Sequence, residues 1–252
     1  MDHLLRATAK AEASHFWFRG FRAFVTPLVQ QAVAGNPAPR ILDCGCGTGA
    51  NVELLGGFGR ACGFDLSEVG LHIAHELGRT RLARASVTAV PFRSESFDLV
   101  TSFDVLYSLE QPDERAAVAE MFRVLKPGGY VVVNVAAMKG LTGNHSVLSR
   151  ERRRYTRASL DTLLTDGGFA IERLTYTNGS LVLPLAIVRA VQRRRGLSSE
   201  SEAQQDIAVP AAPINVALTA LLLLESVWLR RFDEPFGSSL LCLAKKPERS
   251  GP

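Results

Sequence analysis

The chain has 252 residues, of which 46% are hydrophobic and 21% are charged. These values exclude a disordered or fibrous protein and indicate one large globular domain, or a domain with an addition. The net charge of +4 is small and its basic excess is local. No nucleic-acid-binding module is recognisable, so we expect no nucleic-acid partner.

The four cysteines form no C-x-x-C pair and no zinc-binding spacing; they are Cys44, Cys46, Cys62 and Cys242. We therefore expect reduced thiols, no metal site and a cytoplasmic protein. The first ten residues lack the apolar segment of a secretory signal.

Residues 1–36 are predicted to be mainly helical. Phe16, Trp17 and Phe18 follow one another within them, which is more aromatic surface than one face of a core helix requires. Two interpretations are open: a helix packed on a sheet, or a lid over a ligand site.

Residues 41–49 read Ile-Leu-Asp-Cys-Gly-Cys-Gly-Thr-Gly, which predicts a buried strand, a tight turn and the start of a helix. Glycine permits positive φ and a close approach of ligand to backbone. The free N–H groups of the next helix point into the same space. This stretch suits a nucleotide-like ligand with an anionic tail. Gly45, Gly47 and Ala50 also match the dinucleotide fingerprint, with Asp65 at the distance of its ribose acid.

The rest of the chain alternates strands and helices, which predicts an α/β fold with a mainly parallel sheet. We expect strands near residues 40–44, 60–65, 81–85, 97–103, 129–136, 169–176 and 238–244. We expect helices near residues 48–57, 68–77, 112–125, 157–166 and 214–229, with an apolar segment at 181–191 and a loop over 193–213.

Five ordered stretches resemble the class I S-adenosylmethionine-dependent methyltransferases over about residues 38–178. They are Asp43-x-Gly-x-Gly-x-Gly49, Gly63-Phe-Asp-Leu-Ser67, Val90-Pro-Phe92, Ser96-Phe-Asp-Leu-Val100 and Arg123-Val-Leu-Lys-Pro-Gly-Gly129. The resemblance implies a Rossmann-like sheet of seven strands, the last antiparallel, with helices on both faces. We expect an N-terminal helical lid over 1–36, a core over 37–180 and 236–247, and a helical insertion over 181–235.

The resemblance also assigns a cofactor site for S-adenosylmethionine. Asp43 would orient the methionine ammonium, Asp65 would bind the ribose hydroxyls, and Leu66 would lie against adenine. Similar methyltransferases often have an acid for the adenine amino group where this chain has Ser86, so that contact departs from the family pattern. The remaining cofactor contacts implied are Gly45, Gly47, Gly49, Val87, Phe103, Trp17 and Arg19.

Methyl transfer from S-adenosylmethionine needs few side chains. The candidate catalytic residues are Tyr107 and His145. Many family members have Glu-His where this chain has Tyr107-Ser108, so Tyr107 would donate a hydrogen bond or face the sulfonium. His145 would be the base if the acceptor must lose a proton. The arginines between residues 150 and 157 either bind an anionic acceptor or are simply solvated.

The sequence therefore predicts methylation of a small molecule at oxygen or nitrogen, in a sugar or secondary-metabolite pathway, by a monomer or homodimer. Two alternatives stay open: a cofactor-binding member repurposed for another reaction, and an NAD-dependent oxidoreductase. The apolar segment 214–229 is interrupted by Asn215, Thr219 and Glu225 and falls short of the ~20 apolar residues of a membrane span. We expect it to be buried in the protein's own substrate cover, with at most a peripheral membrane contact.

Overall fold

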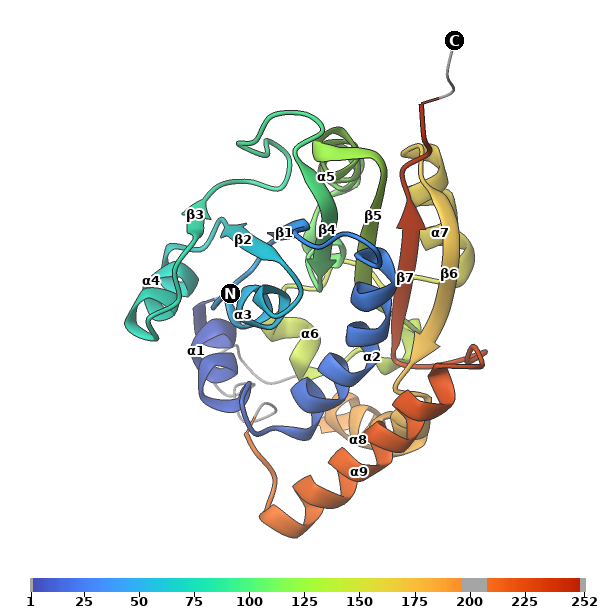
Figure 1. Cartoon of the computed structure of the whole chain (residues 1–252). Helices are drawn as coiled ribbons and strands as arrows, with labels where there is room; N and C mark the ends of the chain where they lie inside the picture. The colour runs from blue at the N-terminus through green and yellow to red at the C-terminus, as the bar shows by residue number, and fades with distance from the viewer. Residues whose placement is uncertain (1, 196–207, 250–252) are drawn as a thin grey trace.

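The alternating strands and helices form one seven-stranded sheet in a computed structural model of the chain (Figure 1), which describes residues 2–195 and 208–249. The strands are β1 (Arg40–Cys44), β2 (Arg60–Asp65), β3 (Leu82–Arg84), β4 (Phe97–Phe103), β5 (Leu125–Ala136), β6 (Ala170–Thr177) and β7 (Ser239–Lys245). The helices are α1 (Asp2–Ala11), α2 (Phe16–Ala32), α3 (Ala50–Gly56), α4 (Glu68–Glu76), α5 (Gln111–Val124), α6 (Asn144–Leu148), α7 (Arg157–Asp166), α8 (Val182–Arg195) and α9 (Ala212–Leu229). Short 3₁₀ turns are η1 (Leu106–Ser108), η2 (Lys139–Leu141) and η3 (Gly179–Leu181).

The strand order is β3-β2-β1-β4-β5-β7-β6. Strands β1 to β5 pair in parallel, and β7 lies antiparallel between β5 and β6. The predicted fold class is confirmed. The order reverses between β1 and β4, and ligands of open α/β sheets bind in the crevice at such a switch point. The loops that follow β1 and β4 are therefore where the site is expected.

Buried side chains on each face of the sheet hold a layer of helices, as predicted. On one face, Ile41 of β1 and Val132 of β5 pack with residues of α2, α3 and α9. On the other face, Leu42 and Val131 pack with residues of α5 and α7. Neighbouring residues of a strand point to opposite faces, so β1 supplies both cores from adjacent positions.

The N-terminal segment and the start of strand β5 differ from the sequence prediction. The N-terminal segment forms two helices and not one. Helix α1 ends at Ala11, and α2 begins at Phe16 with His15 as its N-cap. Strand β5 begins at Leu125 instead of 129. Leu125 pairs with Phe97 of β4, and Pro127 lacks the N–H that a longer α5 would need.

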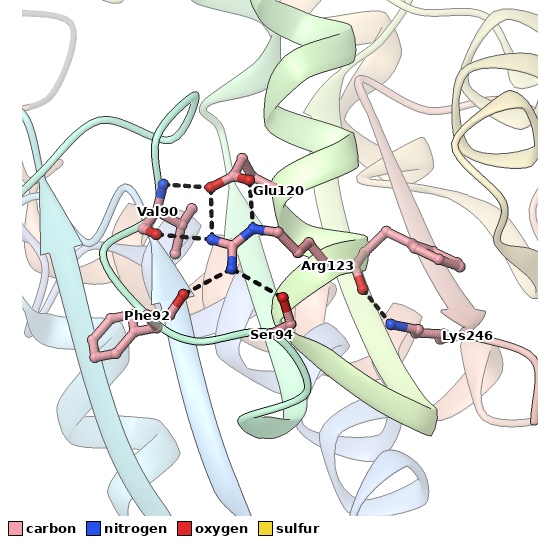
Figure 2. A network of polar contacts seen from close by, with 7 residues as sticks. Val90, Phe92, Ser94, Glu120, Arg123 and Lys246 are labelled. Atoms are coloured by element: carbon pink, nitrogen blue, oxygen red, sulfur yellow. Dashed lines mark hydrogen bonds and ion pairs between the residues drawn. The ribbon is translucent and has the colours of Figure 1, made fainter.

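Arg123, at the end of α5, connects two of the five sequence stretches, the one at Val90–Phe92 and the one that begins at Arg123 itself. Its guanidinium donates to the carbonyl oxygens of Val90, at 2.9 Å, and Phe92, at 2.8 Å (Figure 2). Glu120 bonds the same guanidinium at 2.6 and 2.8 Å and accepts the N–H of Val90 at 2.7 Å. The loop after β3 is thereby fixed to α5 by both its N–H and C=O groups.

Helix α9 has its polar side chains inside and its apolar side chains outside, which corrects our expectation that its apolar side is buried. Asn215, Thr219, Glu225 and Ser226 are buried, together with Leu222 and Leu229. Ile214, Val216, Leu223, Leu224, Val227 and Trp228 are exposed. Among the residues described, α9 is the one helix that is long and apolar enough to cross a membrane.

The contact between α2 and α9 depends on Gly20. A Cβ at this position would lie 2.8 Å from the Cβ and 2.4 Å from the Cδ1 of Leu222. Gly20→Ala is expected to lower the free energy of unfolding by about 1–3 kcal/mol, because Leu222 cannot move without shifting α9.

Gly56→Ala is the matched control, since nothing lies within 4 Å of a Cβ placed there. Because the position is helical, Gly56→Ala should raise the free energy of unfolding by up to about 1 kcal/mol. Urea unfolding of both variants checks the pair. Equal stability of Gly20→Ala and wild type would contradict the close packing of α2 on α9.

Candidate functional site

The turn after β1 is built on three glycines with positive φ: Gly45 at 85°, Gly47 at 53° and Gly49 at 80°. A Cβ at Gly45 would lie 2.3 Å from Cγ2 of Val105, and one at Gly49 would lie 2.8 Å from Cδ1 of Leu82. These two glycines are thus required by the turn and by packing within the chain. At Gly47 a Cβ would approach only Leu5 of α1, at 3.2 Å.

Asp65, the last residue of β2, connects the turns after β1 and β2. Its Oδ2 accepts the N–H of Gly47 at 2.8 Å, and its Oδ1 accepts the N–H of Ser67 at 2.7 Å. Each carboxylate oxygen can accept a further bond, so the acid can still receive two hydroxyl groups. The neighbouring Leu66 is 65% exposed and offers an apolar surface beside it.

Asp43 is fully enclosed near the end of β1 and has one oxygen without a partner. Its Oδ1 accepts from Thr101 Oγ1 at 2.6 Å, whereas Oδ2 is buried without a hydrogen bond. Burial raises the pKa of Asp43 to about 7; the Thr101 bond opposes this shift and the nearby Asp65 adds to it. A buried acceptor without a donor calls for a ligand that supplies one.

Helix α1 lies over this turn, where the sequence places a lid. Glu12, just after α1, accepts from Thr48 Oγ1 at 2.7 Å and pairs with Arg79 at 2.6 Å. Arg79 also donates to the carbonyl oxygen of Thr48 at 2.8 Å. In α2, Trp17 is half-buried and packs on the core, and Arg19 is exposed. The contact of these two side chains with a cofactor stays a prediction.

Ser86 and Val87 follow β3, as the sequence predicts for the adenine side of the site. The Ser86 hydroxyl is 2.8 Å from Thr88 Oγ1 and also accepts the N–H of Thr88. Val87 is buried in the core. Both hydrogen-bonding partners of Ser86 are therefore local, which weakens it as an adenine ligand.

Asp104, directly after β4, was not singled out from the sequence. Its φ is 61°, a rare value for a residue other than glycine, and its Oδ1 accepts from Asn134 Nδ2 at 3.0 Å. Its side chain is accessible to solvent, yet protein atoms around it raise the pKa of its carboxyl to about 7 by desolvation. Asp104 therefore lies at the surface beside the end of β4 and not in the core. An acid immediately after a buried strand is the signal that would have found it.

Tyr107 and His145 were the sequence candidates for catalysis. Tyr107 is buried, and burial together with Asp104 and Glu151 holds the pKa of its phenol well above the usual range. It can donate a hydrogen bond but cannot serve as a base. His145 lies in α6, and its side chain is outside the described part of the structure. Phe103, the last residue of β4, packs edge-on against Phe21 of α2 with 5.0 Å between ring centroids.

The arginines near residue 150 bind the protein itself. Arg153 pairs with buried Glu114, and its guanidinium also donates to the carbonyl oxygen of Leu109 at 2.8 Å. Arg154 pairs with Glu151 at 2.5 Å and donates to the carbonyl oxygen of Ala137 at 2.8 Å. Arg152 pairs with Glu110, and Arg157 donates to the carbonyl oxygen of Leu174. This engagement removes the main argument for an anionic acceptor.

The sequence matches a known domain family and named relatives. Residues 42–133 match the model of a family described as "Methyltransferase domain". A protein of Mycolicibacterium smegmatis named "Probable S-adenosylmethionine-dependent methyltransferase" is 30% identical over 170 residues, covering 63% of this chain and 61% of the relative. Over this part of the sequence the chain is similar to the S-adenosylmethionine-dependent methyltransferases. The nicotinamide interpretation of its glycine pattern thereby loses its support.

Other similarities are more distant or shorter. A "Demethylmenaquinone methyltransferase" of Clavibacter sepedonicus is 38% identical over 112 residues, covering 41% of this chain and 43% of that protein. The chain thus spans less than two thirds of the length of the curated relatives it matches. The structure of a "SAM-dependent methyltransferase, possible histamine N-methyltransferase" from Thermotoga maritima has a TM-score of 0.57 at 19% identity, covering 97% of this chain and 98% of that one. The "[4+2]-Cyclase SpnF" has a TM-score of 0.55 at 20% identity, covering 90% and 81%. These two share the fold.

S-adenosylmethionine is the cofactor that the family implies, and the residues present fit it. The unpartnered Oδ2 of Asp43 is an acceptor for an ammonium group, and Asp65 is an acceptor for paired hydroxyls. Gly47 leaves room between the turn and α1 that only Leu5 approaches. Leu66 supplies an exposed apolar side chain next to Asp65.

The raised pKa of Asp43 predicts pH-dependent cofactor affinity. Below pH 7 the carboxyl is protonated and must lose its proton to pair with an ammonium group. The affinity for S-adenosylhomocysteine should therefore fall about tenfold from pH 8 to pH 6, by calorimetry. Asp43→Asn should bind weakly and without this pH dependence.

Asp104→Asn is the control, because Asp104 also has a pKa raised to about 7. It should keep the pH dependence of wild type. If Asp104→Asn abolishes the dependence and Asp43→Asn retains it, the assignment to Asp43 is wrong.

Proposed function

We propose that the chain transfers a methyl group from S-adenosylmethionine to an oxygen or nitrogen of a small-molecule acceptor. The observation that carries this proposal is the buried, unpartnered Oδ2 of Asp43 beside the glycine turn, at the switch point of the sheet. The similarity to a methyltransferase domain and to a named S-adenosylmethionine-dependent relative supports the same cofactor.

In this proposal the main task of the protein's residues is to bind the cofactor and position the acceptor. Bound S-adenosylmethionine supplies an activated methyl group, so orienting the acceptor supplies much of the rate. In our proposal Asp43 and Asp65 hold the two polar ends of the cofactor. The Glu12–Thr48 bond ties the end of α1 to the glycine turn, and in our proposal this holds α1 over the site and keeps water out.

Asp104 is our added candidate for the acceptor side. It lies after β4, next to the loop that carries Tyr107, and its carboxyl has a pKa raised to about 7. A base with a pKa near the working pH is effective for an acceptor that must lose a proton. His145 stays the alternative base. Sugars, secondary metabolites and, from the named relatives, quinone-like aromatics are the acceptor classes to test.

A second candidate function is a reaction other than methyl transfer with the cofactor bound. The observation that favours it is the fold shared with the "[4+2]-Cyclase SpnF". Cofactor binding without any consumption of S-adenosylmethionine across an acceptor panel would favour it, and formation of S-adenosylhomocysteine with a methylated product would exclude it.

Asp65→Asn tests the cofactor site directly. Losing a charged hydrogen bond to a ribose hydroxyl costs about 1.5–3 kcal/mol, so calorimetry should show a roughly 10- to 150-fold weaker binding of S-adenosylhomocysteine.

Glu68→Gln is the matched control, since it removes the same charge three residues away on an exposed side chain. It should bind S-adenosylhomocysteine like wild type. Absence of binding by the wild-type protein would overturn the proposed function. Equal losses of affinity in both variants would show that Asp65 contributes only through the net charge of the region.

A further inference from the structure

Two helices near the carboxyl edge of the sheet expose an apolar surface, which we call the α8–α9 face. Leu224 is 70% exposed and Trp228 is 55% exposed, and Trp228 packs on exposed Phe232 with ring centroids 4.4 Å apart. The exposed apolar residues of the face are Leu183, Ile187, Val188 and Val191 of α8, and Ile214, Val216, Leu221, Leu223, Leu224, Val227 and Trp228 of α9. Exposed large apolar side chains gathered on neighbouring elements are a feature of sites that bind another protein or a membrane.

The orientation of α9 is fixed by its buried polar side chains. Asn215 accepts the N–H of Phe16 at 2.8 Å and donates to the carbonyl oxygen of Ser14 at 2.9 Å. Glu225 accepts the N–H groups of Gly179 and Ser180, both at 3.1 Å. Turning the helix to bury its leucines would leave these buried groups without hydrogen-bonding partners, which is most unfavourable for the carboxylate. The outward apolar side is therefore built into the fold.

These bonds also argue against α9 as a membrane span. Both ends of the helix are tied to the soluble core through Asn215 and Glu225, and Leu222 packs on Gly20 of α2. A helix that is held along one side and apolar along the other suits the plane of a membrane surface.

Among the described residues, the exposed charges on the two helices and directly after α9 are basic. Helix α8 contains four arginines and no acidic residue, and the only charged residue of α9 is the buried Glu225. Arg230 and Arg231, which follow α9 directly, are exposed, as is Arg194 of α8. The acid that follows them, Asp233, pairs with Arg173 at 2.8 Å. A phosphate-rich surface complements this arrangement.

We propose that the α8–α9 face docks the protein peripherally onto an anionic lipid bilayer. Leucine, tryptophan and phenylalanine side chains enter the acyl boundary while the arginines contact lipid phosphates. A second copy fits less well, because a two-fold interface would bring the arginines of one face toward those of the other, without exposed acids on either helix. This inference does not depend on the proposed function.

The face lies at the same edge of the sheet as the cofactor site. Strand β6 runs parallel to β1, and η3 and α8 follow its carboxyl end; α9 leads back to the start of β7, where Ser239 pairs with Thr177. In Figure 1, α8 and α9 accordingly lie beyond the sheet on the side of α1 and α6. Docking would place the substrate side of the protein toward the lipid.

Vesicle flotation tests the proposal with the full chain. Wild type should float with vesicles that contain phosphatidylglycerol and much less with vesicles of phosphatidylcholine alone. Leu224→Ala should weaken the partitioning roughly tenfold or more, since about 0.8 kcal/mol is lost per buried CH₂. Arg230→Gln with Arg231→Gln should weaken it roughly 30-fold, at about 1 kcal/mol for each arginine.

Matched controls separate the face from the rest of the surface. Leu77→Ala removes an exposed leucine from another helix end, and Arg93→Gln removes an exposed arginine from the loop after β3. Both should float like wild type. In a Trp17→Phe background, Trp228 fluorescence should shift to the blue when anionic vesicles are added.

Three results would overturn the proposal. One is recovery of the wild type only in the soluble fraction. Another is equal flotation of wild type and Leu224→Ala. The third is a dimer in light scattering that Leu224→Ala dissociates without any vesicle binding, because that would assign the face to a second copy.

Discussion

The carboxylate of Asp65 is the group on which the site depends, because it fixes two turns from neighbouring strands to each other. It receives one N–H from the glycine turn after β1 and one from the turn after β2. The parallel pairing of Asp43 with Gly63 brings the two acids to adjacent strand ends. Their mutual repulsion adds to burial in raising the pKa of Asp43. The two acids therefore repel each other, and a cationic ligand bound between the turns would lessen that repulsion.

The same turn connects the sheet to the N-terminal helices. Thr48 of the turn bonds Glu12, and Arg79, at the end of the α4 segment, bonds both. Leu5 of α1 covers Gly47. The contact between the N-terminal helices and this turn therefore depends on one buried carboxylate, that of Glu12.

Much of the core could be predicted from the sequence because its strands are continuously buried. Residues 97–103 form a strand with the predicted bounds, and the helix 157–166 also has the predicted ends, set by Thr156 and Gly167. Three features could not be predicted. A run of arginines looks the same whether it faces solvent or, as with Arg154, bonds carbonyl oxygens inside the protein. Hydropathy gives the apolar content of α9 but not the direction of its leucines, which is set by partners of Asn215 nearly 200 residues away, with separations of 199 and 201. The accessibility of Asp104 follows from a backbone angle that no sequence pattern shows.

Asn215 has a mechanical consequence for the whole molecule. Its amide bonds the backbone at Ser14 and Phe16, which is the joint between α1 and α2. Any ligand of the outer side of α9 that displaces this helix also displaces the joint, and with it the cover of the glycine turn. Thermodynamic linkage then requires the reciprocal effect: a cofactor that orders the cover changes the affinity of the outer face by the same factor. A binding constant for either ligand is defined only at a stated concentration of the other.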